Sequence, residues 1–324
     1  MPHTQTPNLR IYHERAGAGP PLLFISGTGG DLRAKPNVFD STLPQHFDLL
    51  AYDQRGLGRT ERPPGPYTMR DYADDAAALL DALGWDRCRV LGVSFGGMVA
   101  QEFALRHPDR VERLVLACTS SGGEGGASYP LHELQDLPVE ERARRMIALN
   151  DSRFAALERD NPDRYARILQ MTIDAMAAPD AWPDEAPGDN NVSRDEGARL
   201  QLEARRHHDT WSRLPDLRMP VYLCAGRYDL IAPPSNSEAT AARIQGGRIQ
   251  GGRVADARLE LFDGATSSSS RTSAPTPPSS TSYVGDWLGW RFPNDGQSTG
   301  RNGGGGPGRA AANTTTSAEL DAPS

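Results

Sequence analysis

The sequence has 324 residues, 37% of them hydrophobic, so the chain can bury a large core and has the length of an α/β domain with an insertion. The formal net charge is -7 and no Lys/Arg cluster stands out, which argues against nucleic acid or an anionic membrane surface as a partner. The amino terminus is polar and no run of about 18 apolar residues occurs, so we expect no signal peptide, no membrane span and a cytoplasmic location.

Short apolar runs alternate with helical patterns over the first 118 residues. The runs predict strands at Leu22–Ile25, Phe47–Tyr52, Cys88–Val93 and Val111–Cys118. The patterns predict helices at Val38–Gln45, Thr68–Leu83 and Phe95–Arg106. This alternation favours an α/β fold with a mostly parallel sheet and helices on both faces. The cysteines lie in or beside apolar runs, and we expect reduced thiols at Cys88, Cys118 and Cys224.

The alternation stops at Thr119, and up to about residue 213 only helical patterns occur. They predict helices at Val139–Arg159, Pro162–Met176 and Arg194–Trp211. Strand, helix and strand then resume at Val221–Gly226, Ser237–Ile244 and Ala257–Phe262. We therefore interpret residues 1–118 and 214–263 as an α/β core and residues 119–213 as a helical cap. Residues 264–324 are more than half Ser, Thr, Gly and Pro, which predicts a low-complexity, disordered tail.

The pentapeptide Gly92-Val93-Ser94-Phe95-Gly96 lies between a predicted strand and a predicted helix. A serine hydroxyl attacks a carbonyl only when a base takes its proton and the resulting oxyanion is stabilised. Glycines on both sides let the chain turn sharply and hold the hydroxyl above the sheet. Ser94 is therefore the candidate nucleophile, and the amides of Phe95 and of Thr28, in Ser26-Gly27-Thr28-Gly29-Gly30, are the candidate oxyanion hole.

The motifs GTGG, YDQRGLGRT, GVSFGG and AGRYD, in this order, make the chain similar to the α/β-hydrolase family over residues 8–263. The similarity is greatest to its capped bacterial lactonases, esterases and cofactor-free haloperoxidase-like enzymes. This chain has Ser26-Gly27 where most such relatives have His-Gly, which matters little if the hole uses backbone groups. The resemblance implies that Asp53–Thr60 braces the site and that Asp229 is the acid orienting a histidine. Glu124 is an alternative acid.

The histidine of the family would follow Leu261-Phe262-Asp263-Gly264, but Ala265-Thr266-Ser267 stands there. All seven histidines precede Asp229, so this chain has no catalytic histidine at the expected place. His207 and His208 could replace it from the cap, although an ordinary cap-surface position is the simpler interpretation. If residues 264–270 are read from the third base of the Gly264 codon, the new frame allows Gly-His followed by four apolar residues. We therefore hypothesise that residues 265–324 are translated out of frame; a genuine divergent tail is the alternative.

These observations predict a serine hydrolase of carboxylic esters or lactones that acts through an acyl-enzyme and is impaired by the missing base. Serine in place of aspartate at the elbow argues against epoxide hydrolases and haloalkane dehalogenases. A C–C bond hydrolase or a haloperoxidase/perhydrolase would use the same residues. A non-catalytic ligand-binding protein and a misfolded product of a damaged gene also stay open. We expect a small-molecule ester or lactone as substrate, and no metal or other cofactor; the GTGG loop lacks the lysine of a P-loop.

Overall fold

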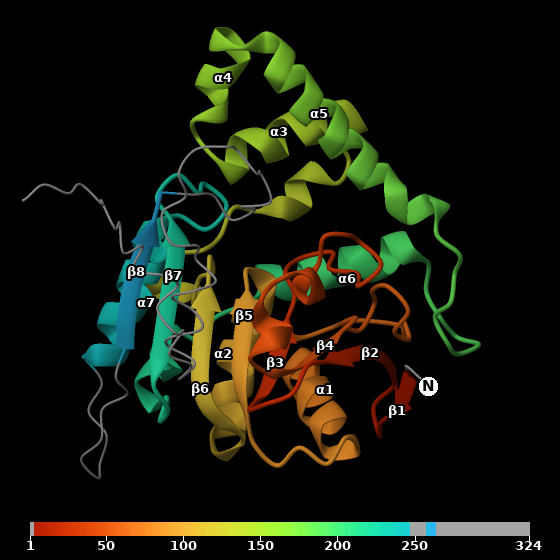
Figure 1. The fold of residues 1–324 in the computed structure, drawn as a ribbon, viewed down its shortest axis with the longest axis vertical. Helices are drawn as coiled ribbons and strands as arrows, with labels where there is room; N and C mark the ends of the chain where they lie inside the picture. Colours follow the sequence, from red (N-terminus) through yellow and green to blue (C-terminus); the bar gives the residue numbers. More distant parts are fainter. Residues whose placement is uncertain (1–2, 247–256, 264–324) are drawn as a thin grey trace, which may run out of the picture. The chain divides into compact units, whose positions relative to one another are not determined.

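The computed structural model describes residues 3–246 and 257–263 (Figure 1). Its strands are β1 (His3–Gln5), β2 (Arg10–Ala16), β3 (Pro21–Ile25), β4 (Asp48–Tyr52), β5 (Cys88–Val93), β6 (Val111–Ala117), β7 (Val221–Gly226) and β8 (Ala257–Phe262). They form one sheet in the order β1-β2-β4-β3-β5-β6-β7-β8. β1 and β2 pair antiparallel, as do β2 and β4, and all other pairs are parallel. The predicted α/β class with a mostly parallel sheet is confirmed.

The α-helices are α1 (Met69–Ala82), α2 (Phe95–Arg106), α3 (Val139–Asn150), α4 (Phe154–Asp160), α5 (Pro162–Ala177), α6 (Arg194–Arg206) and α7 (Pro234–Gln245). α1, α2 and α7 share one large apolar core with alternate residues of the central strands, such as Leu23 and Leu114. α1 begins where the sequence predicts, because Thr68 forms a capping box with Asp71. This core holds the carboxyl ends of the parallel strands in fixed positions.

The other face of the sheet forms a second cluster with short 3-10 turns. A single helix was expected at Val38–Gln45, and that expectation is wrong: the chain forms two turns, η1 (Val38–Asp40) and η2 (Leu43–Gln45). Ser41 between them is extended, and Pro44 inside η2 has no N–H for a continuous helix.

Two strands at the edge of the sheet, β1 and β2, were not expected. β2 has the sequence RIYHERA, in which only Ile11 and Tyr12 are buried, so it lacks the apolar run that marks the central strands. Backbone pairing with β4 fixes it instead, and an antiparallel strand with a polar face needs no continuous apolar stretch.

Helices α3 to α6 all lie between β6 and β7 in the sequence, and no described residue of 119–213 is in a strand. The expected helix Val139–Arg159 is divided into α3 and α4 at Asp151, which is extended. The Asp151 carboxylate accepts a hydrogen bond from the Arg153 N–H, and the Ser152 N–H donates to the Tyr228 carbonyl. The N–H groups of Ser152 and Arg153 thus bond to the loop after β7 and to the Asp151 side chain, and not to carbonyls of the preceding helical turn.

α6 likewise ends at Arg206, earlier than the expected Trp211. Beyond it, the Thr210 hydroxyl donates to Gln101 on α2 and the Thr210 N–H donates to the Ser121 carbonyl. These buried bonds turn the chain into the 3-10 turn η7 (Trp211–Asp216). The predicted tail, and with it the out-of-frame hypothesis, lies outside the described residues. Within the described part of the chain, no helix is long and apolar enough to cross a membrane.

Candidate active site

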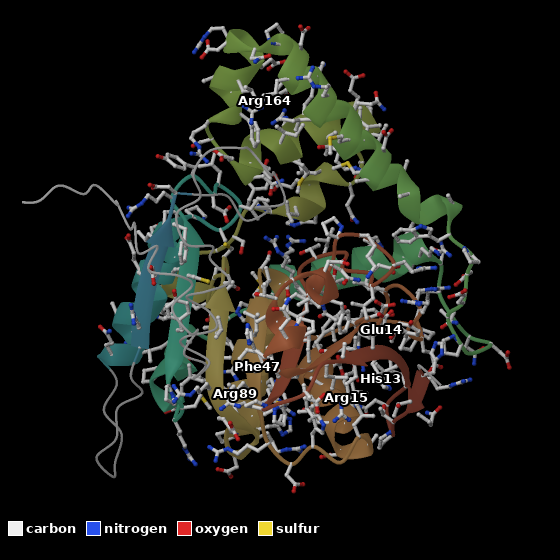
Figure 2. The ribbon with its side chains drawn as sticks, viewed as in Figure 1. His13, Glu14, Arg15, Phe47, Arg89 and Arg164 are labelled. Atoms are coloured by element: carbon white, nitrogen blue, oxygen red, sulfur yellow. The ribbon has the colours of Figure 1, made fainter. Side chains whose placement is uncertain are left out.

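The carboxyl ends of the parallel strands meet along one edge of the sheet. β3 and β5 are neighbours, and so are β5 and β6 and then β6 and β7. Ser94 follows β5 directly, whereas Arg89 near the start of β5 and Phe47 just before β4 lie at the opposite edge (Figure 2). Loops at the carboxyl ends of parallel strands are where α/β proteins bind ligands. The predicted site residues therefore lie, as expected, in loops at the carboxyl ends of the strands.

Ser94 has an uncommon backbone conformation, with φ 54° and ψ -117°. Its N–H donates to the Ala117 carbonyl at 2.8 Å, and the Thr119 hydroxyl donates to its carbonyl at 2.7 Å. β6 and the loop after it thus hold both backbone groups of the serine in place. A non-glycine residue with positive φ costs of order 1–3 kcal/mol and persists only where its surroundings impose it.

The glycines of the elbow leave no room for a side chain. A Cβ at Gly96 would lie 2.0 Å from the Ile25 carbonyl oxygen, and one at Gly92 would lie 2.3 Å from that of Gly96. Both separations are far below van der Waals contact. The two positions thus need glycine because backbone approaches backbone, which explains the pentapeptide in terms of packing.

The two candidate oxyanion donors both come from segments next to Ser94. Phe95 is the first residue of α2, where a helical N–H has no partner within the helix. A Cβ at Gly27 would lie 3.4 Å from Ser94 Cβ and 4.0 Å from its Oγ, so the loop carrying Thr28 passes directly beside the serine. The Thr28 hydroxyl oxygen is buried with no partner among the described residues.

Two glutamines hold the loop that carries Thr28, and sequence reasoning did not single out either. Gln54 Nε2 donates to the Ser26 carbonyl at 2.9 Å, and Gln201 Oε1 on α6 accepts from the Gly29 N–H at the same distance. Both side chains are fully buried. Gln54 lies in Asp53–Thr60, the segment expected to brace the site. A buried glutamine in a polar helical pattern gives no local signal that would have identified Gln201.

Asp229 lies in the loop after β7, buried with 1% of its surface exposed. Its Oδ1 accepts hydrogen bonds from the Ile231 and Ala232 N–H groups at 2.8 and 3.0 Å. These bonds orient the carboxylate at the expected place for the acid. Glu124, the alternative acid, is exposed and accepts a bond from the Trp211 indole.

The histidines near the end of α6 differ in their surroundings. His207 is exposed and contacts Glu203 at 2.9 Å. The expected surface position is wrong for His208, which is only 6% exposed. Burial lowers the pKa of His208 to about 4, an effect that the Ser120 backbone and Asp209 oppose only in part and that Arg213 and Arg205 reinforce.

His208 is expected to make the protein less stable in mild acid. Because its folded pKa is below the unfolded value, its contribution is complete above about pH 6.5 and is lost as the pH falls towards 4. Between pH 7.5 and pH 5 we expect the free energy of unfolding of the parent to change by about 2 kcal/mol less favourably than that of His208→Gln. Urea unfolding at the two pH values measures it.

The neighbouring His207→Gln variant is the matched control and should keep the full pH dependence. Comparing variants is necessary because burial raises the pKa of Asp53 to about 6, which changes stability in the opposite direction over the same range. Equal pH dependence in His208→Gln and the parent would contradict the assignment.

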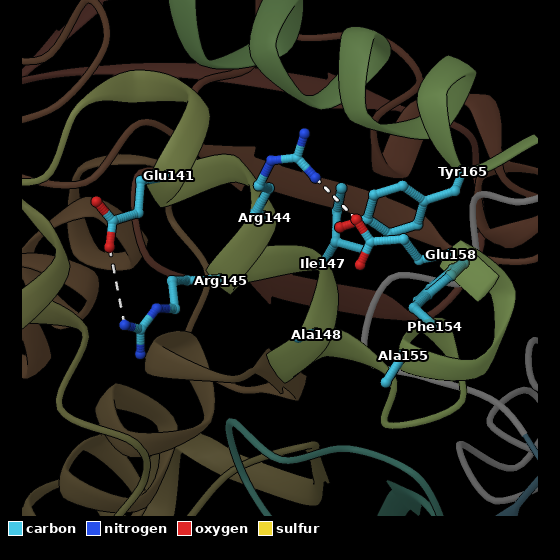
Figure 3. A pocket seen from close by; sticks show the side chains of 9 residues that line it. All are labelled: Glu141, Arg144, Arg145, Ile147, Ala148, Phe154, Ala155, Glu158 and Tyr165. Carbon is cyan, nitrogen blue, oxygen red and sulfur yellow. Dashed lines mark hydrogen bonds and ion pairs between the residues drawn. The ribbon is translucent and has the colours of Figure 1, made fainter. Parts of the chain in front are cut away.

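Two of the cavities among the described residues lie near the cap helices. One, of about 280 Å³, lies between α3, α4 and α5, where its arginines pair with glutamates: Arg144 with Glu158 and Arg145 with Glu141 (Figure 3). The other, of about 290 Å³, is lined by α2, the loop after β6 and the end of α6. No group of three or more metal-ligating side chains occurs in the described ranges.

The sheet is mostly parallel, and Ser94 occupies a strained turn between the central strand β5 and the helix α2. These two features define the class as an α/β protein with a serine at a strand–turn–helix junction. The sequence model of the alpha/beta hydrolase fold matches residues 20–257, and the chain belongs to the α/β-hydrolase family. The predicted family is thereby confirmed.

Several of the named relatives are hydrolases. The chain is 27% identical over 246 residues to a putative carbamate hydrolase RutD of Azorhizobium caulinodans, covering 72% of this chain and 82% of that protein. It is 39% identical over 121 residues to 2-hydroxymuconate semialdehyde hydrolase of a Pseudomonas species, covering 36% and 41%. An esterase structure from Thermogutta terrifontis is 25% identical with a TM-score of 0.57, over 82% and 89% of the chains. The enol-lactonase of Burkholderia xenovorans shares the fold at 23% identity and a TM-score of 0.61, over 82% and 92%. These similarities support a hydrolase as the general class.

Proposed function

We propose that the chain is built to hydrolyse carboxylic esters or lactones through an acyl-enzyme on Ser94. The observation that carries this proposal is the elbow, where a serine with φ 54° stands at the start of α2 beside the Gly27–Thr28 turn. Backbone strain of this kind gathers at active sites, and a helix N-terminus stabilises developing negative charge.

In this mechanism Ser94 Oγ bonds to the substrate carbonyl carbon while its proton passes to a base. The carbonyl oxygen becomes an oxyanion that accepts hydrogen bonds from the Phe95 and Thr28 N–H groups. The C–O bond then breaks, the leaving alkoxide takes the proton from the base, and water repeats the sequence to release the acid. Asp229 would orient the base and stabilise its protonated form.

The base is the missing part of this arrangement. The sequence contains no histidine after His208, and residues 264–324, where the family would have one, are outside the described structure. That absence supports a second candidate, a ligand-binding protein that keeps the pocket without turnover. A C–C bond hydrolase is a third, supported by the 39% identity to 2-hydroxymuconate semialdehyde hydrolase.

An acyl-enzyme test separates these candidates. We expect a chain carrying Gly-His after Asp263 to be labelled at Ser94 by a fluorophosphonate and to hydrolyse p-nitrophenyl butyrate. The parent chain should do neither, because no base activates its serine. Intact-mass spectrometry and absorbance measure the two results, with Ser94→Ala as the control.

Labelling and turnover by the parent chain would contradict the missing base. An inert, unlabelled histidine-containing chain that small esters stabilise against heat would support the ligand-binding protein. Cleavage of a vinylogous diketone without ester cleavage would support the C–C bond hydrolase.

A further inference from the structure

The cavity beside α6 contains an arginine without a counter-charge. Arg205 is 6% exposed, and its Nη1 donates to the Tyr129 carbonyl at 2.7 Å. Its Nε and Nη2 have no hydrogen-bond partner among the described residues. Burial alone lowers its pKa, to about 10, so the group stays a cation at neutral pH. An unpaired buried charge is costly, and a bound anion would offset that cost.

The open edge of Arg205 is the edge that binds carboxylates elsewhere in this protein. Nε and Nη2 form one side of the planar guanidinium, and Arg55 uses these two nitrogens to hold both oxygens of Asp75 at 2.6 and 2.8 Å. Arg106 holds Asp74 in the same way. A fork of two parallel N–H groups matches the geometry of a carboxylate.

The walls of the cavity also favour an anion. The lining contains no aspartate or glutamate. Its second arginine, Arg206, is exposed and paired with Glu203, so Arg205 supplies the buried positive charge of the cavity. The chain as a whole carries a net charge of -7, so this composition is local. A volume of about 290 Å³ is at the small end for ligand sites, which suits a small molecule.

The cavity lies next to the elbow through Met98 and Ser120, and Ser94, Phe95 and Thr28 are not among the residues that line it. The Met98 N–H bonds to the Ser94 carbonyl, and Ser120 directly follows Thr119, which holds the same carbonyl. On α6, Arg205 is one turn after Gln201, which holds the Gly29 N–H. Residues four apart lie on the same face of a helix, so Arg205 and the oxyanion loop share one side of α6.

We propose that this cavity is a carboxylate-binding subsite, in which Arg205 holds the two oxygens through Nε and Nη2. A carboxylate bound here belongs to the substrate, so the preferred esters or lactones carry a free acid group a short distance from the scissile carbonyl. The preference for substrates with a free acid group rests on the proposed function, whereas binding of the anion does not.

Binding is tested on the parent chain without turnover, by titration calorimetry with succinate. We expect binding that succinamide, its neutral analogue, does not reproduce, and that Arg205→Met weakens by at least about 30-fold, as for loss of a charge-assisted pair. Arg205→Lys keeps the charge without the fork and should bind with intermediate affinity. Arg199→Met, on the same helix but exposed and paired with Glu196, should bind as the parent does.

Thermal unfolding without ligand distinguishes binding from a structural role. Replacing an unpaired buried cation by methionine should raise the Tm of Arg205→Met, whereas a purely structural arginine would leave a less stable variant. Equal succinate affinity in the parent and Arg205→Met, or equally tight binding of inorganic phosphate and sulfate, overturns the proposal.

Turnover separates this subsite from the proposed function. In the histidine-containing chain, the p-nitrophenyl hemiester of succinate should be preferred to p-nitrophenyl butyrate, and Arg205→Met should remove the preference through KM. Succinate binding without hydrolysis of any ester would retain the subsite and overturn the proposed function. Ester hydrolysis without succinate binding or charge preference would do the reverse.

Discussion

Restoring a histidine after Gly264 is expected to accelerate ester hydrolysis by on the order of a million-fold, the loss measured when serine hydrolases lose their histidine. A one-base insertion at the Gly264 codon gives the frame in which Gly-His can follow. Under the proposed function the gain is large because Ser94 already stands at the strained turn beside the Gly27–Thr28 loop and lacks only a proton acceptor. Steady-state rates with p-nitrophenyl butyrate, compared between the two chains, measure it.

Ser94→Ala in both chains is the control. In the histidine-containing chain it should remove nearly the whole gain, and in the parent chain it should change the rate little, because serine and base act as a unit. A gain below about tenfold, less than general-base catalysis ordinarily supplies, would show that the supporting geometry is not as proposed.

Gly96→Ala is expected to lower the free energy of unfolding by more than about 4 kcal/mol, or to prevent folding. A methyl group at this position would lie 2.0 Å from the Ile25 carbonyl oxygen and 2.5 Å from that of Ser26. Neither is a flexible side chain, so α2 and β3 would have to separate. Urea unfolding followed by circular dichroism measures the loss, and soluble yield reports on a variant that does not fold.

Gly84→Ala is the control variant, in which the substitution changes backbone strain but creates no close contact. Gly84 has φ +70°, and nothing lies within 4 Å of a Cβ placed there. Its substitution should cost only the left-handed strain of a non-glycine residue, about 1–2 kcal/mol. Gly96 lies in α2 and has no positive φ, so its cost should come from contact alone. A Gly96→Ala loss no larger than the Gly84→Ala loss would show that the contacts with the Ile25 and Ser26 carbonyls relax at little cost.

Most of the central fold could be predicted because its signals are local. Buried parallel strands are continuous apolar runs, and the helix at Met69 has a capping box in the sequence. The strand Arg10–Ala16 gave no such signal because pairing with β4 determines it. The break at Asp151 was missed for a related reason: the bonds from the loop after β7 that replace the helical ones are tertiary.

The predicted site residues divide in the same way. Ser94, Phe95 and Thr28 belong to glycine-rich motifs whose spacing encodes a turn, so they could be named in advance. Arg205 and His208 read as polar residues of a helix surface, and nothing in Arg205-Arg206-His207-His208 distinguishes the buried pair from the exposed pair. Their significance depends on burial, and for Arg205 on the lack of a counter-charge, which only the packing of α6 reveals.

The left-handed conformation of Ser94 has a consequence for how residue 94 would change over time. Strain at a nucleophile is retained because catalysis requires it, and a glycine would adopt the same backbone angles without strain. In a lineage that has lost its base, substitution of Ser94 by glycine improves stability and sacrifices nothing, so drift should remove the serine. Under the hypothesis that this chain has lost its base, an intact serine in an intact elbow is the state expected soon after that loss, before neutral substitution has reached the position.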